Sequence, residues 1–206
     1  MPDIQDILAL CGLLERGEIE GPPFIERFCR LMAGVIGCSR CGVWVFVDGV
    51  ETRVLHCIGM FDATQDRMVP VTDIVNAKDG PYFETLLRDT CVIAPDARTH
   101  PATRGFADDY LAPLEIRSLL DVCFSVNGVP FGMFSCEQIG VPMDWTLRQL
   151  QQLRQIGSRA SLTLVRAAAA ATDTGPASLW DTSSPNRFMT MPLPLDGGAN
   201  DTTKPK

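Results

Sequence analysis

Residues 91–126 read CVIAPDARTHPATRGFADDYLAPLEIRSLLDVCFSV, and this stretch decides the fold. Its apolar start predicts a strand over residues 91–94 that stops at Pro95. The carboxylate of Asp96 can then accept hydrogen bonds from the backbone N–H groups that follow it. The stretch therefore begins as a strand that ends in a capped loop.

The second half of this stretch returns the chain to the sheet. Apolar residues at helical spacing predict a short helix around Tyr110, and Pro113 ends it. A strand is predicted over residues 118–126, and Asn127-Gly128 leads into another over residues 129–137. Because Asn-Gly between two apolar runs favours a tight turn, we expect these strands to form a hairpin.

The order of these motifs resembles a GAF domain of bacterial signalling proteins. The run SRCGVWVFVD at residues 39–48 comes before it, and GMFSCE at 132–137 and DWT at 144–146 follow. The resemblance covers about residues 20–165. It implies an α+β fold with a GAF-like central antiparallel sheet of five or six strands. N- and C-terminal helices would cover one face, and short helices and loops the other.

The chain of 206 residues divides into three predicted parts. We expect residues 1–19 to form an N-terminal helical extension, and residues 20–171 a GAF domain with a long C-terminal helix. Residues 172–206 are rich in Thr, Asp, Ser, Gly and Pro, which predicts a disordered tail.

Charge and hydropathy exclude several classes of partner. The net charge is −7 with a pI near 4.8, whereas nucleic-acid binding needs clustered Lys and Arg. No apolar run reaches the length that crosses a bilayer, and the N-terminus has no secretory signal. We therefore expect a cytoplasmic protein that binds neither nucleic acid nor membrane.

The closing helix is predicted to begin with Asp144 as its N-cap and to run to about Ala171. Small and apolar residues recur along it in steps of three and four, at Leu150, Leu153, Gly157, Ala160, Leu164 and Ala167. This seam suits either packing on the sheet or a homodimer through helix 145–171, and the sequence leaves both open.

Side-chain alternation assigns the strand residues to two faces. The GAF resemblance implies a ligand cavity on the face away from the terminal helices, where alternation places an indole and a carboxylate. The candidate ligand-binding residues are Trp44, Phe46, Tyr82, Phe83, Asp96, Tyr110, Arg117, Asp121 and Cys123. Phe106 is expected in the core. A competing interpretation makes Asp121 structural, either accepting from backbone donors or paired with Arg117 or Arg98.

The eight cysteines are expected mainly as core residues. Cys38 and Cys41 form the only closely spaced pair, without a second pair or a His-rich partner motif, so we expect no metal site. The sequence identifies no cofactor. A cytoplasmic location also disfavours disulfides.

The leading functional hypothesis is a sensory or regulatory module that binds an unidentified small molecule. No catalytic motif is present, so it is not expected to be an enzyme, and the terminal helices would signal to a separate effector protein. One alternative is a thiol-based redox sensor, or an enzyme like methionine sulfoxide reductase relatives, using Cys123 with Cys136 or Cys91. Another is a ligand-free dimerisation scaffold.

Overall fold

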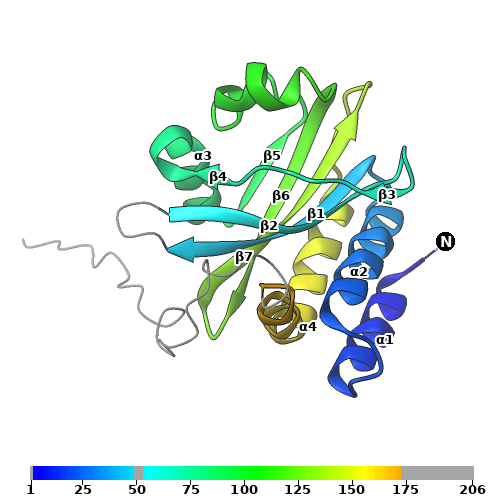
Figure 1. Cartoon of the computed structure of the whole chain (residues 1–206). Helices are drawn as coiled ribbons and strands as arrows, with labels where there is room; N and C mark the ends of the chain where they lie inside the picture. Colours follow the sequence, from blue (N-terminus) through cyan, green and yellow to red (C-terminus); the bar gives the residue numbers. More distant parts are fainter. Residues whose placement is uncertain (1, 49–52, 173–206) are drawn as a thin grey trace, which may run out of the picture.

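The computed structural model describes residues 2–48 and 53–172 (Figure 1). Its helices are α1 (Ile4–Glu15), α2 (Gly21–Ile36), α3 (Asn76–Asp89), the short η1 (Arg104–Phe106) and η2 (Ala107–Leu111), and α4 (Leu147–Thr172). Its strands are β1 (Arg40–Asp48), β2 (Arg53–Asp62), β3 (Arg67–Met68), β4 (Ile74–Val75), β5 (Cys91–Ala94), β6 (Ile116–Val126) and β7 (Val129–Ile139).

All strands belong to one antiparallel sheet, in the order β3-β2-β1-β7-β6-β5, with β4 paired to β2. This confirms the α+β prediction. The predicted hairpin is also present, since Val126 pairs with Val129. Asn127 and Gly128 both have positive φ, 51° and 79°, as two-residue hairpin turns require.

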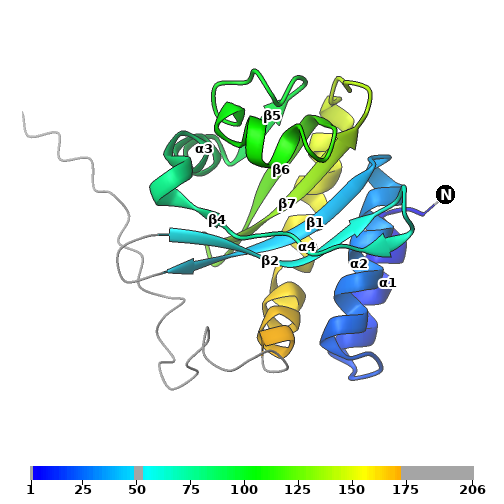
Figure 2. The same cartoon turned by 45° about the horizontal axis from the view of Figure 1, so that its top comes forward.

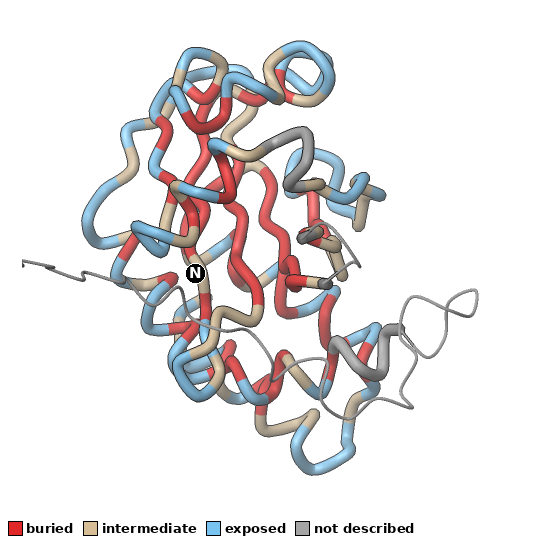
Figure 3. Tube along the Cα trace, turned by 90° about the vertical axis from the view of Figure 1, so that its left-hand side faces the viewer, coloured by how far each residue is buried: buried red, intermediate tan, exposed pale blue. Residues whose placement is uncertain are grey.

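The two faces of the sheet carry different layers (Figures 1 and 2). Helices α1, α2 and α4 pack together on one face, as predicted, and α3, η1 and η2 lie over the other. The central strands are buried between these layers (Figure 3). Helix α1 belongs to the main core because Ile7, Leu10 and Cys11 are buried in it. The N-terminal extension is therefore integral to the helical layer.

The seam of α4 is buried inside the single chain. Leu150, Leu153, Ala160, Leu164 and Ala167 all lie in the core under the sheet. Helix α4 lies close to the sheet at Gly157, where an added Cβ would be only 3.0 Å from Cβ of Phe124. The homodimer through helix 145–171 stays a prediction.

The predicted N-cap of α4 is wrong. Thr146, not Asp144, occupies that position: its Oγ1 accepts from the Gln149 backbone N–H at 3.2 Å, and the Gln149 side chain accepts from the Thr146 N–H at 2.8 Å. This reciprocal pair is a capping box. Asp144 is exposed and lies too far upstream to contact the first free N–H groups of the helix.

Helix α3 contains Gly80 and Pro81, two residues that normally interrupt helices. The helix nevertheless spans both residues, anchored by the buried side chains of Tyr82, Phe83 and Leu86.

The tail that the sequence predicts to be disordered, residues 172–206, lies outside the described residues, apart from Thr172 at the end of α4. Within the described residues, no helix has the length and apolar character needed to span a membrane.

Candidate ligand cavity

A cavity of about 160 Å³ lies between the sheet and the layer of α3, η1 and η2. Its floor comes from β1, β6 and β7, and its walls from the segment that contains β4, from α3 and from the short helices. The lining residues are Trp44, Val71, Thr72, Asp73, Ile74, Val75, Tyr82, Phe106, Asp109, Tyr110, Leu119, Asp121, Met133, Ser135 and Glu137. Sites for drug-sized ligands measure roughly 300–1,000 Å³, so this cavity suits a compact molecule.

Asp121 occupies the floor with half of its hydrogen-bonding capacity unused. The Tyr82 hydroxyl donates to Oδ2 at 2.7 Å, whereas Oδ1 is buried and has no hydrogen-bond partner among the described residues. Burial raises the pKa of Asp121 from 3.8 to about 7, against the lowering effects of the Ser135 and Tyr82 hydroxyls. Near neutral pH this carboxyl group therefore exchanges readily between its charged and neutral forms.

Trp44, another residue of the lining, carries an unpaired donor. Its side chain is 2% exposed, and Nε1 has no hydrogen-bond partner within the described part of the chain. Buried polar atoms are normally paired, since leaving one unpaired costs about 1–3 kcal/mol. Two residues of the lining thus each carry one unpaired polar atom, a donor on Trp44 and an acceptor on Asp121.

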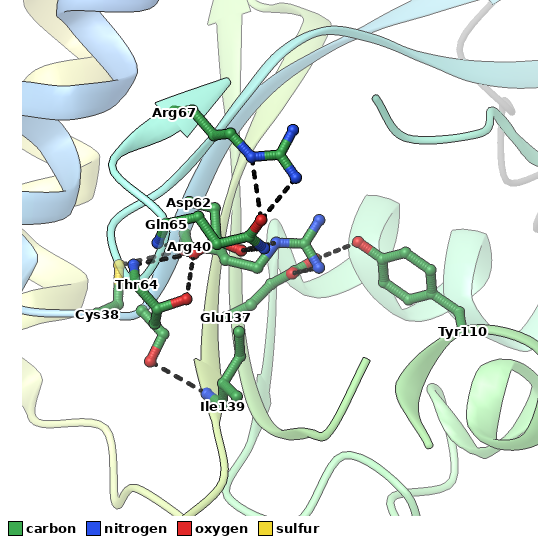
Figure 4. A network of polar contacts seen from close by, with 10 residues as sticks. Cys38, Arg40, Asp62, Thr64, Gln65, Arg67, Tyr110, Glu137 and Ile139 are labelled. Carbon is green, nitrogen blue, oxygen red and sulfur yellow. Dashed lines mark hydrogen bonds and ion pairs between the residues drawn. The ribbon is translucent and has the colours of Figure 1, made fainter. Parts of the chain in front are cut away.

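Glu137 is the third polar residue of the lining, and two partners hold its carboxylate in place (Figure 4). The Tyr110 hydroxyl donates to Oε1 at 2.6 Å, and Nη1 of Arg40 forms an ion pair with Oε2 at 3.2 Å. Burial raises the pKa of Glu137, and the nearby positive charge of Arg40 opposes that rise. Nε of Arg40 also lies 3.9 Å from Oδ2 of Asp62, so one buried cation lies between two carboxylates.

Asp62 ties this network to the turn after β2. Its Oδ1 accepts from the backbone N–H and the hydroxyl of Thr64, at 2.9 and 2.6 Å. Its Oδ2 accepts from Nε2 of Gln65 at 3.0 Å (Figure 4). These bonds hold the far side of the Arg40 guanidinium, so that Glu137 keeps a fixed position at the cavity wall.

The lining is acidic. It contains Asp73, Asp109, Asp121 and Glu137, and no Lys, Arg or His belongs to the lining in the described residues. Asp73 contacts His56 behind it, with Oδ1 and Nδ1 at 2.8 Å. Such a lining favours ligands that donate hydrogen bonds or carry positive charge, and opposes phosphates and other anions.

The structure assigns the predicted residues to three groups. Trp44, Tyr82, Tyr110 and Asp121 line the cavity. Phe46, Phe83 and Cys123 belong to the same hydrophobic cluster but are not among the described residues that line the cavity. The rings of Phe46 and Phe83 pack on each other with centroids 6.4 Å apart.

Asp96 and Arg117 lie outside the cavity. Oδ1 of Asp96 accepts from the Arg98 backbone N–H at 3.3 Å, which confirms its capping role, but its side chain is exposed. The expected pairing of Asp121 with Arg98 or Arg117 is wrong for Arg98, whose guanidinium donates to the carbonyl groups of Ile116 and Leu111. Arg117 and Asp121, which both lie in the described part of the chain, form no ion pair either, and the carboxylate of Asp121 is bound by Tyr82.

Several lining residues were missed by the sequence analysis. Met133, Ser135 and Glu137 alternate along β7 and point to the cavity, and the same period-2 pattern would have identified them. Phe106 was expected in the core, yet it lines the cavity. Its ring packs edge-on against the ring of Tyr82, with centroids 5.0 Å apart. Nothing in the sequence indicated the wall at residues 71–75.

The thiols proposed for redox chemistry are separated. Cys123 faces the cavity side of the sheet, whereas Cys91 and Cys136 pack with the helix-side core. Burial raises the pKa of the Cys123 thiol to about 12, which disfavours the reactive thiolate. The arrangement does not assemble the predicted cysteine pair.

An antiparallel sheet with both terminal helices on one face and a roofed cavity on the other defines the class of this protein as an α+β domain. The chain belongs to the GAF family, since the model of the GAF domain matches residues 23–164. A search of curated proteins found no match.

Solved GAF structures share this fold at low identity. The phycocyanobilin-bound GAF domain from a cyanobacterial phytochrome is 11% identical with a TM-score of 0.61, covering 81% of this chain and 96% of that one. The GAF domain from Acinetobacter phosphoenolpyruvate-protein phosphotransferase is 12% identical with a TM-score of 0.59, covering 84% and 97%. Free methionine-R-sulfoxide reductase from Neisseria meningitidis, with its substrate, is 12% identical with a TM-score of 0.53, covering 73% and 81%. These likenesses show a shared fold.

Proposed function

We propose that this chain is a sensory or regulatory GAF module that binds one compact, hydrogen-bond-donating molecule in the cavity. The observation that carries the proposal is the pair of unpaired buried atoms, Nε1 of Trp44 and Oδ1 of Asp121, on two residues that line one cavity. A ligand that accepts from the indole and donates to the carboxylate satisfies both. The acidic lining makes a small molecule that combines a cationic donor, such as an ammonium or amidinium group, with a hydrogen-bond acceptor the best match.

The ligand signal would pass through the sheet to the terminal helices. On β7, Met133 and Ser135 line the cavity, and Phe134 between them points to the opposite face. There a Cβ on Gly157 would lie 3.3 Å from Cε2 of Phe134, so α4 contacts β7 through this side chain. A ligand that prefers one position of β7 therefore biases the packing of α4, to the extent that its affinity differs between the two states.

The receiver of this signal is a separate effector protein or a second copy of the chain. With its seam buried, α4 would use its exposed side, where Leu162 is 61% exposed. The cytoplasmic location stays a prediction of the sequence.

Native mass spectrometry of the full chain purified from its own cells tests the proposal. We expect one small-molecule adduct per chain, absent from Asp121→Asn and Trp44→Phe. The matched control is Asp96→Asn, which removes an exposed carboxylate outside the cavity and should keep the adduct. A chain without adduct would favour the ligand-free scaffold, and an adduct retained by both cavity variants would place the ligand elsewhere.

A further inference from the structure

Three cysteine sulfur atoms meet on the helix side of the sheet, away from the cavity. Cys38 lies between α2 and β1, Cys41 lies on β1, and Cys136 lies on β7. The register pairs Cys41 directly with Cys136, which brings their Sγ atoms to 3.4 Å. All three Sγ atoms lie within 4.8 Å of one another. The fold thus completes a group of which the sequence indicated only the Cys38 and Cys41 pair.

The separations match those around a metal ion. Three sulfur atoms placed about 2.3 Å from one ion in a plane are about 4 Å apart. The distance of 3.4 Å for Cys41 and Cys136 and the upper limit of 4.8 Å bracket that value.

The surroundings select the kind of ion. Cys41 and Cys136 are 0% exposed and Cys38 is 7% exposed, so water has little access as a further ligand. Among the described residues, no fourth His, Cys, Asp or Glu joins the group. Zinc sites in proteins are almost always four-coordinate, whereas an all-sulfur set without a fourth ligand suits a soft ion such as Cu(I).

We propose that Cys38, Cys41 and Cys136 form a three-sulfur binding site for a soft, thiophilic cation of the Cu(I) class. Each ligand forms a metal–sulfur bond as its thiol loses a proton to solvent, and the oxidation state of the metal does not change. The site is separate from the ligand cavity, on the opposite face of the same strands. Its existence does not depend on the proposed sensory function.

Metal binding at this site should depend on pH. Each of the three thiols has to lose its proton before its sulfur can bind the ion, so the apparent affinity should rise with pH.

Anaerobic titration of the full reduced chain with Cu(I), in competition with the chelator bathocuproine disulfonate, tests the proposal. We expect one tightly held Cu(I) per chain, and X-ray absorption should show three sulfur neighbours and no nitrogen or oxygen neighbour. Cys38→Ser, Cys41→Ser and Cys136→Ser should each weaken binding by at least roughly 100-fold, since even partners outside the ligand set are worth 10- to 100-fold.

Cys29→Ser is the matched control, because Cys29 is equally buried but belongs to no such group. It should bind Cu(I) like the natural chain. Cys→Ala versions at the three positions, normalised to the folded fraction by circular dichroism, separate lost ligation from lost folding. Absence of Cu(I) uptake, equal uptake by the folded triple variant, or retention of zinc in place of Cu(I) would each overturn the proposal.

Discussion

The Tyr82 hydroxyl donates a hydrogen bond to Oδ2 of Asp121 at 2.7 Å across the cavity floor. This bond joins α3 to β6 and fixes the carboxyl group, so that Oδ1 keeps one orientation within the cavity. Without a cationic partner, burial dominates the protonation of Asp121 and raises its pKa to about 7. A raised pKa is expected of a buried carboxyl group in a binding site when the ligand that donates to it is absent.

Asp121→Asn should remove a pH dependence of stability. Because the pKa rises from 3.8 in the unfolded chain to about 7 in the folded one, the folded state holds an extra proton between these values. The free energy of unfolding of the natural chain therefore falls as the pH increases from about 4 to about 7. The loss is up to about 4 kcal/mol, at 1.36 kcal/mol per pH unit. Urea unfolding at pH 4 and pH 8 measures the change.

At pH 8 the Asp121→Asn variant should be more stable than the natural chain, and at pH 4 the two should be similar. Asp108→Asn is the control, because Asp108 is exposed and its substitution should leave the pH profile unchanged. Equal pH slopes for the natural chain and Asp121→Asn would contradict the buried state of this carboxyl group.

Glu137→Gln should destabilise the chain by about 3 kcal/mol, because it leaves the buried Arg40 charge without its nearest partner. The double variant Arg40→Met/Glu137→Gln removes both charges of this ion pair, so neither charge is left buried without the other. Part of the lost stability should therefore return. Chemical unfolding of the four members of the cycle gives the coupling energy. Asp89→Asn, which breaks an exposed ion pair with Arg88, should cost less than about 1 kcal/mol. Additive losses in the cycle would show that the two side chains act independently.

Gly132→Ala should cost about 3 kcal/mol or more, as overpacking does when the backbone cannot yield. A Cβ at this position would lie 2.1 Å from the carbonyl oxygen of Trp44 and 2.7 Å from Cζ of Phe124. Thermal unfolding gives the loss. Gly80→Ala is the contrast: no atom lies within 4 Å of its Cβ, and Ala in a helix gains about 0.5–1 kcal/mol over Gly. If Gly132→Ala were well tolerated, β1 and β7 would have to lie farther apart at this position than the structure shows.

Thr146→Ala should destabilise the chain by about 1 kcal/mol, the usual loss on removing an N-cap side chain. Asp144→Ala should change stability by less than about 0.5 kcal/mol, because Asp144 is an exposed residue before the cap. Urea unfolding of both variants under the same conditions decides between the two caps. The reverse ranking would restore Asp144 as the cap.

The sequence alone determined the layers of the fold. Period-2 alternation assigned Trp44 and Asp121 to one face and Leu120 and Phe124 to the other, and the structure confirms each assignment. The Asn127-Gly128 turn was predictable for the same reason, since local backbone preference decides it. These features depend on residues that are close together in the sequence, so the sequence alone predicts them.

The partners of the buried polar groups were decided by tertiary structure. Tyr82 meets Asp121 across 39 positions of sequence, and Cys41 meets Cys136 across 95. Such pairs follow from strand register and from where α3 lies over the sheet, which no local pattern encodes. For that reason the sequence proposed arginine partners for Asp121, while the folded chain provides a tyrosine hydroxyl and leaves the second oxygen of the carboxylate unpaired.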